Sequence, residues 1–490
     1  MLLKETPMKL KDLLKGVDVI QYWADLETEI TAVNYDSRKV TPGSLFVAVS
    51  GFVTDGNQYI PMALEKGAVA VVTAKKPDGD VPYILVASDR LALALIGSNY
   101  YGNPAEVMTL IGITGTNGKT SSTLILKHIL ETTRGAKVGL IGTMENLIGA
   151  EVVPTERTTP ESLDLQALFA RMRDEGCSHV IMEVSSHAIA LERVGGVHFH
   201  VAAFTNLTED HLDFHKTMEN YCDTKAELFC RSDKCVANMD DAWFARICAK
   251  TDKTVLTTSA KGVADLYATD LELLSDGISF KAVCDEDSAR VRLPIPGRFT
   301  VYNALTVLGI ARQLGISLKE AAEALKTAKG VKGRVEVVPT PGKPYTVLID
   351  YAHTPDGLEN VLSSVRGFCK GRLIAVFGCG GDRDPIKRPI MGKIGVDIAD
   401  YAIITSDNPR TEAPMAIIED ILKGVDSNKK NYEVIENRPQ AIRQAMDIAQ
   451  KNDIIVLAGK GHETYQEIHG IKHHLDEREV VAAYLEETRK

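Results

Sequence analysis

The sequence predicts an α/β protein of three domains: a small N-terminal α/β domain, a central domain built on a parallel sheet, and a C-terminal Rossmann-like α/β domain. Three observations support this fold class. The chain has 490 residues, and a domain takes about 150 residues. Apolar runs that suit strands alternate with amphipathic stretches that suit helices, as in parallel sheets. Glycines and charged residues gather directly after several of the apolar runs.

The N-terminal part contains short elements. Strands are expected at Ser44–Val49 and Ala68–Thr73, and a helix is expected over residues 91–102. The pair Asn103-Pro104 reads as a turn, because proline cannot continue a helix. We therefore expect the three domains at residues 1–106, 107–338 and 339–490.

The central part begins with an apolar, β-branched run at Thr109–Thr114. A glycine-rich turn joins this run to a helical pattern over 119–133. Further strands are expected at 179–186, 201–207 and 234–240, and helices at 163–175, 218–229 and 303–314. Strands that alternate with helices in this way predict a parallel sheet.

Four apolar runs in the C-terminal part each end in polar or glycine residues. The runs cover 345–353, 372–382, 401–409 and 453–461, and their ends carry Asp350 and His353, Asp382 and Arg383, Asn408 and Arg410, and Lys460 and Glu463. Ligands of open parallel sheets gather at the carboxyl ends of the strands. The pattern therefore predicts a binding site along this edge of the C-terminal sheet.

Composition and charge exclude several classes of function. Lys+Arg is 56 and Asp+Glu is 66, so the net charge is −10, whereas sequence-independent nucleic-acid binding needs a basic surface. The N-terminus lacks the apolar core of a signal peptide, and no apolar stretch is long enough to span a membrane. The eight cysteines form no C-x-x-C pair and suit reduced, mostly buried thiols. We expect a cytoplasmic monomer that acts on small molecules.

The glycine-rich turn is a candidate phosphate loop. It comprises Gly115, Thr116, Asn117, Gly118, Lys119, Thr120 and Ser121. Glycines let backbone N–H groups turn toward phosphate oxygens, and the following helix adds the positive end of its dipole. Lys119 would neutralise the β- and γ-phosphates of ATP, and the Thr120 hydroxyl would reach a Mg²⁺ ion. The motif is a variant, because Ile113 stands where the first glycine of the usual spacing belongs.

Two candidate metal ligands follow neighbouring strands. Glu183 ends one apolar run, and His211 follows the next; in a parallel sheet both strand ends face the phosphate loop. Mg²⁺ prefers oxygen ligands such as Glu183, while the softer His211 would suit Mn²⁺ as well. Lys225 lies in a helical run and, from the sequence alone, reads as a surface lysine.

Taken together, these residues resemble the Mur ligases. The resemblance covers nearly the whole chain and rests on eleven blocks: TGTNGKTS (114–121), TTP (158–160), MEVSSHA (182–188), NLTEDHLDFH (206–215), YCDTKAELF (221–229), GRFTVYNAL (297–305), KGR (332–334), DYAHTPD (350–356), GCGGDRD (378–384), SDNPRTE (406–412) and AGKGHETYQ (458–466). The blocks are most similar to the family branch that adds the third amino acid to UDP-N-acetylmuramoyl dipeptide. That branch implies phosphorylation of a carboxylate by ATP, attack by an amino acid on the acyl phosphate, and release of ADP, with the domains closing over the nucleotide.

The resemblance also implies roles for individual residues. The residues implied in catalysis are Lys119, Glu183, His211 and Lys225, the last as a carbamylated lysine. Two Mg²⁺ ions would be held by Thr120, Glu183, His211 and carbamylated Lys225. Beyond the phosphate loop, the implied ATP contacts are Asn303, Arg334, Asp350 and His353. The implied contacts to the UDP-linked substrate are Ser37, Arg38, Thr158, Thr159, Ser185 and Arg193.

One alternative interpretation and one departure from the family pattern bear on these implied roles. From the residues alone, Ser37-Arg38 is an ordinary turn. Leu191 stands where some relatives carry a glutamine that contacts substrate, so that contact is in doubt here.

The block Asp407-Asn408-Pro409-Arg410 bears on the choice of amino acid. It resembles the form found in enzymes that use meso-diaminopimelate, which carries a second carboxylate that lysine lacks. An arginine fork binds such a carboxylate through two charge-assisted hydrogen bonds. The remaining implied contacts to the amino acid are Arg383, Gly459 and Glu463, with Arg383 on a carboxylate and Glu463 on the distal ammonium.

Several alternatives are kept. They are the L-lysine-adding ligase of the same family, a folylpolyglutamate synthetase-like ligase, and a non-catalytic protein that binds muramoyl peptides. For Arg410 alone, the alternative is a surface salt bridge.

Overall fold

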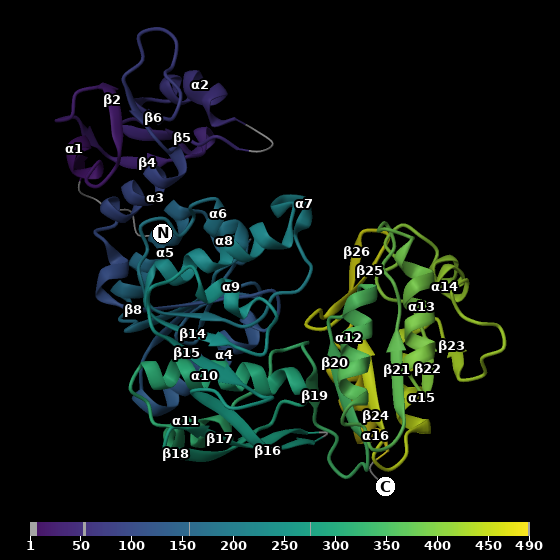
Figure 1. Ribbon diagram of the computed structural model, residues 1–490. Helices are drawn as coiled ribbons and strands as arrows, with labels where there is room; N and C mark the ends of the chain where they lie inside the picture. The colour runs from purple at the N-terminus through teal and green to yellow at the C-terminus, as the bar shows by residue number, and fades with distance from the viewer. Residues whose placement is uncertain (1–6, 52–54, 156, 275, 489–490) are drawn as a thin grey trace. The chain divides into compact units, whose positions relative to one another are not determined.

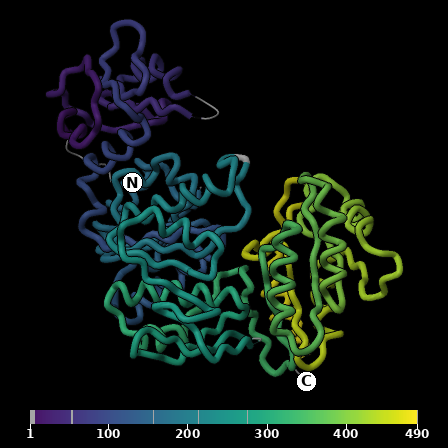
Figure 2. The backbone as a smooth tube through the Cα atoms, in the orientation of Figure 1, coloured from purple at the N-terminus to yellow at the C-terminus, as the bar shows by residue number. Residues whose placement is uncertain are grey.

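The structure is a computed structural model that describes residues 7–51, 55–155, 157–274 and 276–488. The protein has three α/β domains with mainly parallel sheets. By packing, Met1–Ser259 and Thr306–Ile316 form one compact unit, and Ala260–Leu305 and Ser317–Lys490 form a second. The path of the chain through each unit can be followed by its colour in Figure 2.

The N-terminal domain has a five-stranded sheet. Its elements are β1 (Met8–Lys9), α1 (Leu10–Leu13), β2 (Val19–Trp23), β3 (Glu29–Ile30), β4 (Ala32–Asn34), η1 (Ser37–Lys39), β5 (Ser44–Ala48), η2 (Gly56–Tyr59), α2 (Ile60–Glu65), β6 (Ala68–Thr73), β7 (Tyr83–Val86), α3 (Asp89–Tyr100) and η3 (Pro104–Val107). The sheet order is β2-β7-β6-β5-β4, with only the edge strand β2 antiparallel to its neighbour. The two expected strands and the expected helix are confirmed as β5, β6 and α3.

The central domain is built on a longer sheet. Its elements in the first unit are β8 (Thr109–Thr114), α4 (Lys119–Arg134), β9 (Val138–Ile141), β10 (Asn146–Ile148), β11 (Glu151–Val153), α5 (Ser162–Asp174), β12 (His179–Glu183), α6 (Ser186–Ala190), β13 (Phe199–Phe204), α7 (Leu212–His215), α8 (Met218–Cys230), β14 (Ser232–Asn238), α9 (Phe244–Cys248) and β15 (Val255–Ser259). Strands β9, β12, β8, β13, β14 and β15 are parallel neighbours in that order. The parallel sheet is confirmed, and the antiparallel additions β10 and β11 were not predicted.

Strand β8 lies in the middle of this sheet, between β12 and β13. It reads TLIGIT, and all but its first residue are buried, as expected for a strand covered on both faces. A Cβ atom at Gly112 would lie 3.0 Å from the ring of Phe199, so the glycine makes room for that ring. Because the three strands are parallel, their carboxyl ends reach the same edge of the sheet.

In the second unit, an antiparallel meander precedes the C-terminal domain. It comprises β16 (Leu266–Leu274), β17 (Gly277–Cys284) and β18 (Asp287–Leu293). Helix α10 (Arg298–Gln313) follows, its residues from Thr306 onward belonging to the first unit, and then α11 (Leu318–Leu325). The helix expected over 303–314 is confirmed, with an earlier start. The meander was not predicted, although exposed and less exposed residues alternate along β18, which is the strand period of two.

The C-terminal domain is a Rossmann-like α/β sandwich. Its elements are β19 (Glu336–Val338), β20 (Thr346–Asp350), α12 (Pro355–Arg366), β21 (Leu373–Phe377), α13 (Lys387–Ile398), β22 (Tyr401–Ile404), α14 (Pro414–Leu422), β23 (Tyr432–Val434), α15 (Arg438–Ile448), β24 (Ile454–Ala458), β25 (Tyr465–Ile468), β26 (Ile471–His474) and α16 (Glu477–Glu487). The sheet order is β19-β20-β24-β21-β22-β23, and all pairs except β19·β20 are parallel. The four expected strands are confirmed as β20, β21, β22 and β24.

Two apolar layers cover this sheet, and its helices can be located by their labels in Figure 1. Residues of α12, α13 and α14 pack against one face, and residues of α15 and α16 pack against the other. Successive residues of β21 contribute to opposite layers: Leu373, Ala375 and Phe377 to the first, Ile374 and Val376 to the second. Both faces being covered, the strands end at an edge where only loops remain to bind ligands.

Two further expectations concern the whole chain. Among the described helices, none has the length and apolar character needed to cross a membrane. Most of the cysteines are buried free thiols, as expected.

Candidate active site

The turn between β8 and α4 has the geometry of a phosphate loop. Gly115 (φ 146°) and Gly118 (φ 85°) adopt backbone conformations that favour glycine. A Cβ atom at Gly115 would lie only 1.9 Å from the hydroxyl oxygen of Thr205. The Lys119 ammonium donates to the carbonyl oxygens of Gly115 and Thr116, each at 2.8 Å. The loop therefore curls around a lysine at the start of a helix.

The segment after β13 fixes this loop from the side. The Thr205 hydroxyl donates to the Asn117 carbonyl at 2.7 Å. Asn206 accepts on both its oxygens, from the backbone N–H of Thr116 at 2.9 Å and of Asn117 at 3.0 Å. Sequence reasoning missed Thr205 and Asn206; the available signal was a polar pair at the end of a strand next to β8.

Glu183, at the end of β12, is buried beside the loop. One carboxylate oxygen accepts from the Thr120 hydroxyl and from the Thr143 N–H, both at 2.9 Å. The other accepts from the Thr143 hydroxyl at 3.0 Å. A Cβ atom at Gly142 would lie 2.6 Å from this carboxylate, so the glycine leaves room for it. The structure therefore brings together Thr120 and Glu183, and it adds Thr143, which the sequence did not indicate.

Lys225 is buried, so its reading as a surface lysine is wrong. Its side chain is 1% exposed because α8 packs its inner face onto the central core. The Lys225 amine donates to the Gly115 carbonyl at 3.0 Å and lies 4.6 Å from the centre of the Tyr221 ring. Burial, and next the charge of Lys119, hold the pKa of Lys225 well below its usual range. The neutral amine is therefore favoured at this position.

His211 lies at the edge of the same region. It precedes α7 with a positive φ of 54°, and its half-exposed ring is 3.4 Å from the carboxylate of Asp210. The ring centre is 4.8 Å from that of His187 and 6.2 Å from that of Tyr221. Tyr221 in turn contacts Lys225, so the tyrosine links His211 to the loop.

The donor set around the loop fits one hard cation better than two. Glu183 and the Thr120 hydroxyl supply oxygen atoms, and Mg²⁺ commonly takes one or two carboxylates plus phosphate oxygens and waters. Within the described part of the chain, no three His, Cys, Asp or Glu side chains are grouped to hold a metal. The nitrogen donors His211 and Lys225 suit Mg²⁺ only if Lys225 becomes an oxygen ligand.

In the second unit, a buried polar cluster follows β22 and β24. The Lys460 side chain is fully buried, and its ammonium donates to the Asn408 carboxamide oxygen at 3.0 Å and to Glu463 at 3.3 Å. Asn408 donates to Glu463 at 2.9 Å. Asp407 lies 3.7 Å from Lys460, and a Cβ atom at Gly459 (φ 119°) would lie 2.6 Å from the Asp407 carboxylate.

The cluster therefore joins four of the residues predicted to bind the amino acid. They are Asp407, Asn408, Gly459 and Glu463. Sequence reasoning noted Lys460 only as a charged strand end, and its burial shows that it organises the other side chains.

Arg410 lies just beyond this cluster, after Pro409. Its guanidinium donates to the Gly381 carbonyl at 2.7 Å and lies 3.4 Å from the Glu467 carboxylate. Arg410 therefore does form an ion pair with Glu467, as the alternative interpretation of this residue expected. The loop that carries Arg383 is tied to the same segment, because the Thr411 hydroxyl donates to Asp382 at 2.5 Å. Arg383 itself is exposed.

The other residues predicted to contact ATP belong to the second unit, whereas the phosphate loop belongs to the first. Asn303 is buried in α10. Asp350 ends β20 and accepts from the N–H groups of Val335 and Ala352 at 2.7 and 2.8 Å, while burial raises the pKa of its carboxyl group. Arg334 lies over the Tyr351 ring, and His353 Nδ1 is 2.8 Å from the Tyr351 carbonyl.

Comparisons with known proteins decide the family. Three family models match in succession: "Mur ligase family, catalytic domain" over 29–96, "Mur ligase middle domain" over 113–311, and "Mur ligase, glutamate ligase domain" over 333–461. A UDP-N-acetylmuramoyl-L-alanyl-D-glutamate--2,6-diaminopimelate ligase of Clostridium botulinum is 48% identical, over 98% of this chain and 100% of that protein. This chain belongs to the Mur ligase family.

Further relatives agree with this Mur ligase assignment. The ligase of the same name from Caldanaerobacter subterraneus subsp. tengcongensis is 48% identical over 99% of this chain and all of that protein. A solved structure under that name matches with a TM-score of 0.79 at 30% identity, over 99% of this chain and 100% of that chain. The three successive matches follow the order of the predicted domains, and the resemblance seen in the sequence is confirmed.

Four of the residues predicted to contact the UDP-linked substrate of a Mur ligase lie together. The Thr159 hydroxyl donates to the Glu183 carbonyl at 2.9 Å, and it accepts from the Ser185 N–H at 3.3 Å. Arg193 donates to the Thr159 carbonyl at 3.3 Å. The hydroxyl oxygens of Thr158 and Thr143 are 3.0 Å apart. Hydrogen bonds therefore connect these four residues to Glu183, the predicted metal ligand, and to its neighbour Thr143.

Ser37 and Arg38 lie apart from that group, in η1 of the N-terminal domain. Asp36 accepts from the Arg38 N–H at 2.9 Å and pairs with its guanidinium at 2.8 Å. The Arg38 side chain is 84% exposed, and Ser37 is buried. These contacts are those of the ordinary turn that the residues alone suggested.

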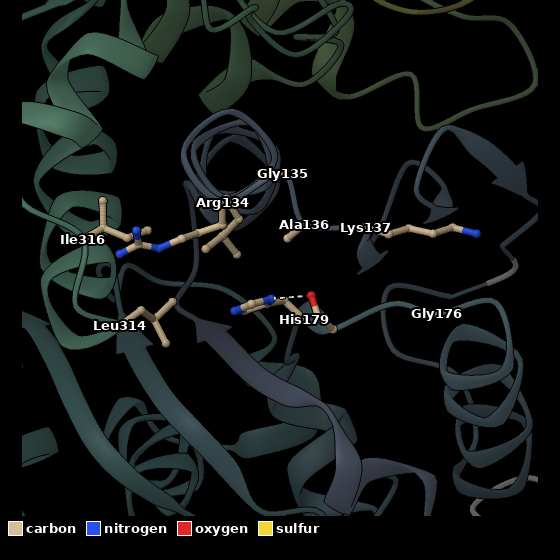
Figure 3. Close-up of a pocket in the computed structure, with 10 residues that line it drawn as sticks. Arg134, Gly135, Ala136, Lys137, Gly176, His179, Leu314 and Ile316 are labelled. Atoms are coloured by element: carbon tan, nitrogen blue, oxygen red, sulfur yellow. Dashed lines mark hydrogen bonds between the residues drawn. The ribbon is translucent and has the colours of Figure 1, made fainter.

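A pocket of about 550 Å³ opens at the other edge of the central sheet (Figure 3). It lies between the end of α4, the start of β12 and the segment 314–316. Figure 3 shows Arg134 and His179 beside the apolar Leu314 and Ile316, with Lys137 pointing away. The pocket is at the amino ends of the strands, so it is not part of the predicted Mur ligase site at their carboxyl ends.

Replacing Gly115 by alanine should impair nucleotide binding. The added Cβ has no room beside Thr205, and overpacking of this kind costs about 1–3 kcal/mol, so ATP affinity should fall about tenfold to a hundredfold. Calorimetric titration of ATP measures this loss. Gly262→Ala is the control, because a Cβ there meets open space. Equal ATP affinity in Gly115→Ala and wild type would show that the loop does not hold the phosphates.

Proposed function

We propose that this protein is an ATP-dependent, ADP-forming ligase that adds meso-diaminopimelate to the γ-carboxylate of D-Glu in UDP-N-acetylmuramoyl-L-Ala-D-Glu, a step of peptidoglycan synthesis. The observation that carries the proposal is the end-to-end match, at 48% identity, to ligases of that name. The phosphate loop, the buried Glu183 and the polar cluster around Asn408 support it.

The chemistry explains why such a site needs cations beside a glycine loop. A free carboxylate is a poor electrophile, so it must first become an acyl phosphate. Two unit charges 4 Å apart repel by about 4 kcal/mol at an effective dielectric constant near 20. Lys119 lies on the loop where the γ-phosphate would sit, and its charge would offset that repulsion and stabilise the transferring phosphoryl group.

Mg²⁺ would be held by Glu183 and the Thr120 hydroxyl, which already contact each other. The bound ion would supply positive charge to the phosphates of ATP. A second Mg²⁺ would require Lys225 as a carbamate, together with His211. We also propose that the protein acts in the cytoplasm as a monomer.

The environment of Lys225 suits carbamylation. The nitrogen of the neutral amine bonds to the carbon of carbon dioxide and a proton is released to solvent, and burial together with the nearby Lys119 favours the neutral amine. The product is an anion that attracts metal ions, where an ammonium would repel them. An anion at this position would also pair with Lys119 across the Gly115 carbonyl that both lysines now share.

The second unit supports the choice of amino acid. Glu463 is available to bind the distal ammonium, held in place by Asn408 and Lys460. Arg410 would bind the distal carboxylate by charge-assisted hydrogen bonds, and Arg383, on an adjoining loop, would hold a carboxylate. Lysine would leave Arg410 facing an ammonium, so a site of this kind disfavours lysine.

An amino-acid preference assay tests the proposal. With ATP, Mg²⁺ and UDP-N-acetylmuramoyl-L-Ala-D-Glu, release of ADP should depend on meso-diaminopimelate, and kcat/KM for L-lysine should be lower by at least about a hundredfold. A higher kcat/KM for lysine would identify the lysine-adding ligase instead. Absence of ADP release with every diamino acid would exclude both ligases.

Arg410→Ala should raise KM for diaminopimelate about tenfold or more, because a charge-assisted pair to the carboxylate is lost. KM for ATP should stay nearly constant. Steady-state kinetics with each substrate varied separately measures both values. Arg443→Ala is a matched control, since Arg443 pairs with Glu487 at the surface. A larger effect on ATP than on diaminopimelate would move Arg410 out of the amino-acid site.

Lys225→Ala should abolish turnover, with partial recovery on adding short-chain carboxylates that replace the carbamate. ADP release measures the loss and the recovery. Carbon NMR of wild type in isotopically labelled bicarbonate should give a carbamate signal that the variant lacks. Full activity of the variant would remove Lys225 from the site.

A further inference from the structure

Three arginines surround one carboxylate at the start of α5. Glu161 Oε2 lies 3.4 Å from Arg193 Nε, 3.7 Å from Arg157 Nη1 and 3.9 Å from Arg90 Nη1. The residues come from three parts of the chain: Arg90 from α3, Arg157 and Glu161 from the segment before α5, and Arg193 from the segment after α6. We call these four residues the arginine cluster.

The cluster carries more positive charge than its own carboxylate neutralises. Arg90, Arg193 and Glu161 have side chains only 18%, 13% and 12% exposed. Burial and the neighbouring arginines lower the pKa of Arg193, against the opposing effect of Glu161. Among the described residues, Arg193 Nε has no hydrogen-bond acceptor. All three ion-pair distances exceed a normal charge-assisted hydrogen bond, so Glu161 satisfies none of the arginines fully.

Other carboxylates near the cluster are already engaged. Asp164 accepts from the Tyr35 hydroxyl at 2.5 Å. Asp89, next to Arg90, accepts from the Ser50 N–H at 2.9 Å. The N–H groups at the start of α5 add positive potential at the same place. The cluster is thus built to receive an additional anion.

Its position relates it to the reaction. Arg193 donates to the carbonyl of Thr159, whose hydroxyl donates to the backbone carbonyl of Glu183. The Glu183 carboxylate in turn accepts from Thr120 of the phosphate loop. Arg157 directly precedes Thr158. Hydrogen bonds therefore connect the cluster, through residues predicted to contact the acceptor, to Glu183 and the phosphate loop.

We propose that Arg90, Arg157 and Arg193 bind the α-carboxylate of the acceptor's D-glutamyl residue, and that Glu161 pairs with them until the acceptor arrives. This inference rests on the proposed function. The acceptor's terminal D-Glu carries two free carboxylates, and only the γ-carboxylate is to be phosphorylated. Holding the α-carboxylate at the cluster directs the γ-carboxylate toward the phosphate loop. Arg90, Arg157 and Glu161 thereby become binding and specificity residues.

The test compares two acceptors by calorimetric titration without nucleotide. One is UDP-N-acetylmuramoyl-L-Ala-D-Glu, and the other carries a neutral α-carboxamide in place of the α-carboxylate. Wild type should bind the amide about tenfold or more weakly. Arg90→Met should bind the acid about tenfold more weakly but lose little further affinity with the amide. Arg171→Met is the matched control, because Arg171 lies on α5 and pairs with Glu151 and Glu175 at the surface.

Glu161→Gln provides a second test with the opposite sign. The amide keeps an oxygen to accept from the Ser162 N–H at the start of α5 but removes the competing negative charge. This variant should bind the acid about threefold or more tightly than wild type, with a smaller gain at high salt. The prediction stands even if Arg90→Met fails to fold.

Specific results overturn the proposal. Equal loss on amidation in wild type and Arg90→Met, or weaker acid binding by Glu161→Gln, excludes the α-carboxylate as the ligand. The weaker acceptor binding of Arg90→Met could also be measured with an acceptor that lacks the uridine and one phosphate. If wild type and Arg90→Met bind that shortened acceptor equally well, the cluster binds the diphosphate instead. Failure of wild type to bind either acceptor would contradict the proposed function itself, whereas the other results leave that function intact.

Discussion

One backbone oxygen ties the central site together. The carbonyl of Gly115 accepts hydrogen bonds from both Lys119 and Lys225, one at the start of α4 and one inside α8. Burial, and next the charge of Lys119, lower the pKa of Lys225 well below its usual range, so two ammonium groups at this one buried oxygen are disfavoured. Gly115 has a φ of 146°, and a side chain at this position would collide with Thr205, so the loop requires glycine here.

Two other groups of the first unit carry charges that the protein itself does not fully neutralise. Glu183 is buried with hydroxyl and N–H donors, and among the described residues no ion pair to it is seen, which suits a carboxylate that is to receive a metal ion. The arginine cluster has the opposite imbalance, with three guanidinium groups around Glu161. A substrate that brings anions and a metal ion would complete both groups.

In the C-terminal domain the buried charges neutralise one another within the protein, because Lys460 lies beside Asp407 and Glu463. Lys460 is fully buried and touches Asn408 and Glu463, so the acidic side chains there are held before any ligand binds. A rigid, partly neutralised cluster can discriminate between amino acids, because a ligand that lacks the expected charge leaves a buried group unpaired. This view makes Lys460 as important to the site as the residues that would touch the ligand.

Much of this protein could be read from local sequence. Strands such as Thr109–Thr114 and Ala68–Thr73 are continuous apolar runs, and Gly118-Lys119-Thr120 between a strand and a helix marks the phosphate loop; both signals depend only on neighbouring residues. The antiparallel meander β16–β18 was not predicted, because apolar and polar residues alternate only weakly along its strands and no recognisable motif accompanies them. The eleven sequence blocks were enough to indicate the family.

Tertiary structure alone decided the rest. Lys225 reads as exposed on its own helix, and only the packing of α8 onto the sheet buries it. Thr143, Lys460 and the meeting of Arg90 with Glu161 depend on contacts between residues distant in the chain. Residue type and spacing determine which elements form and which chemistry is available. Which charges end up buried together is set by the fold, because burial and Coulomb energy depend on distances in space.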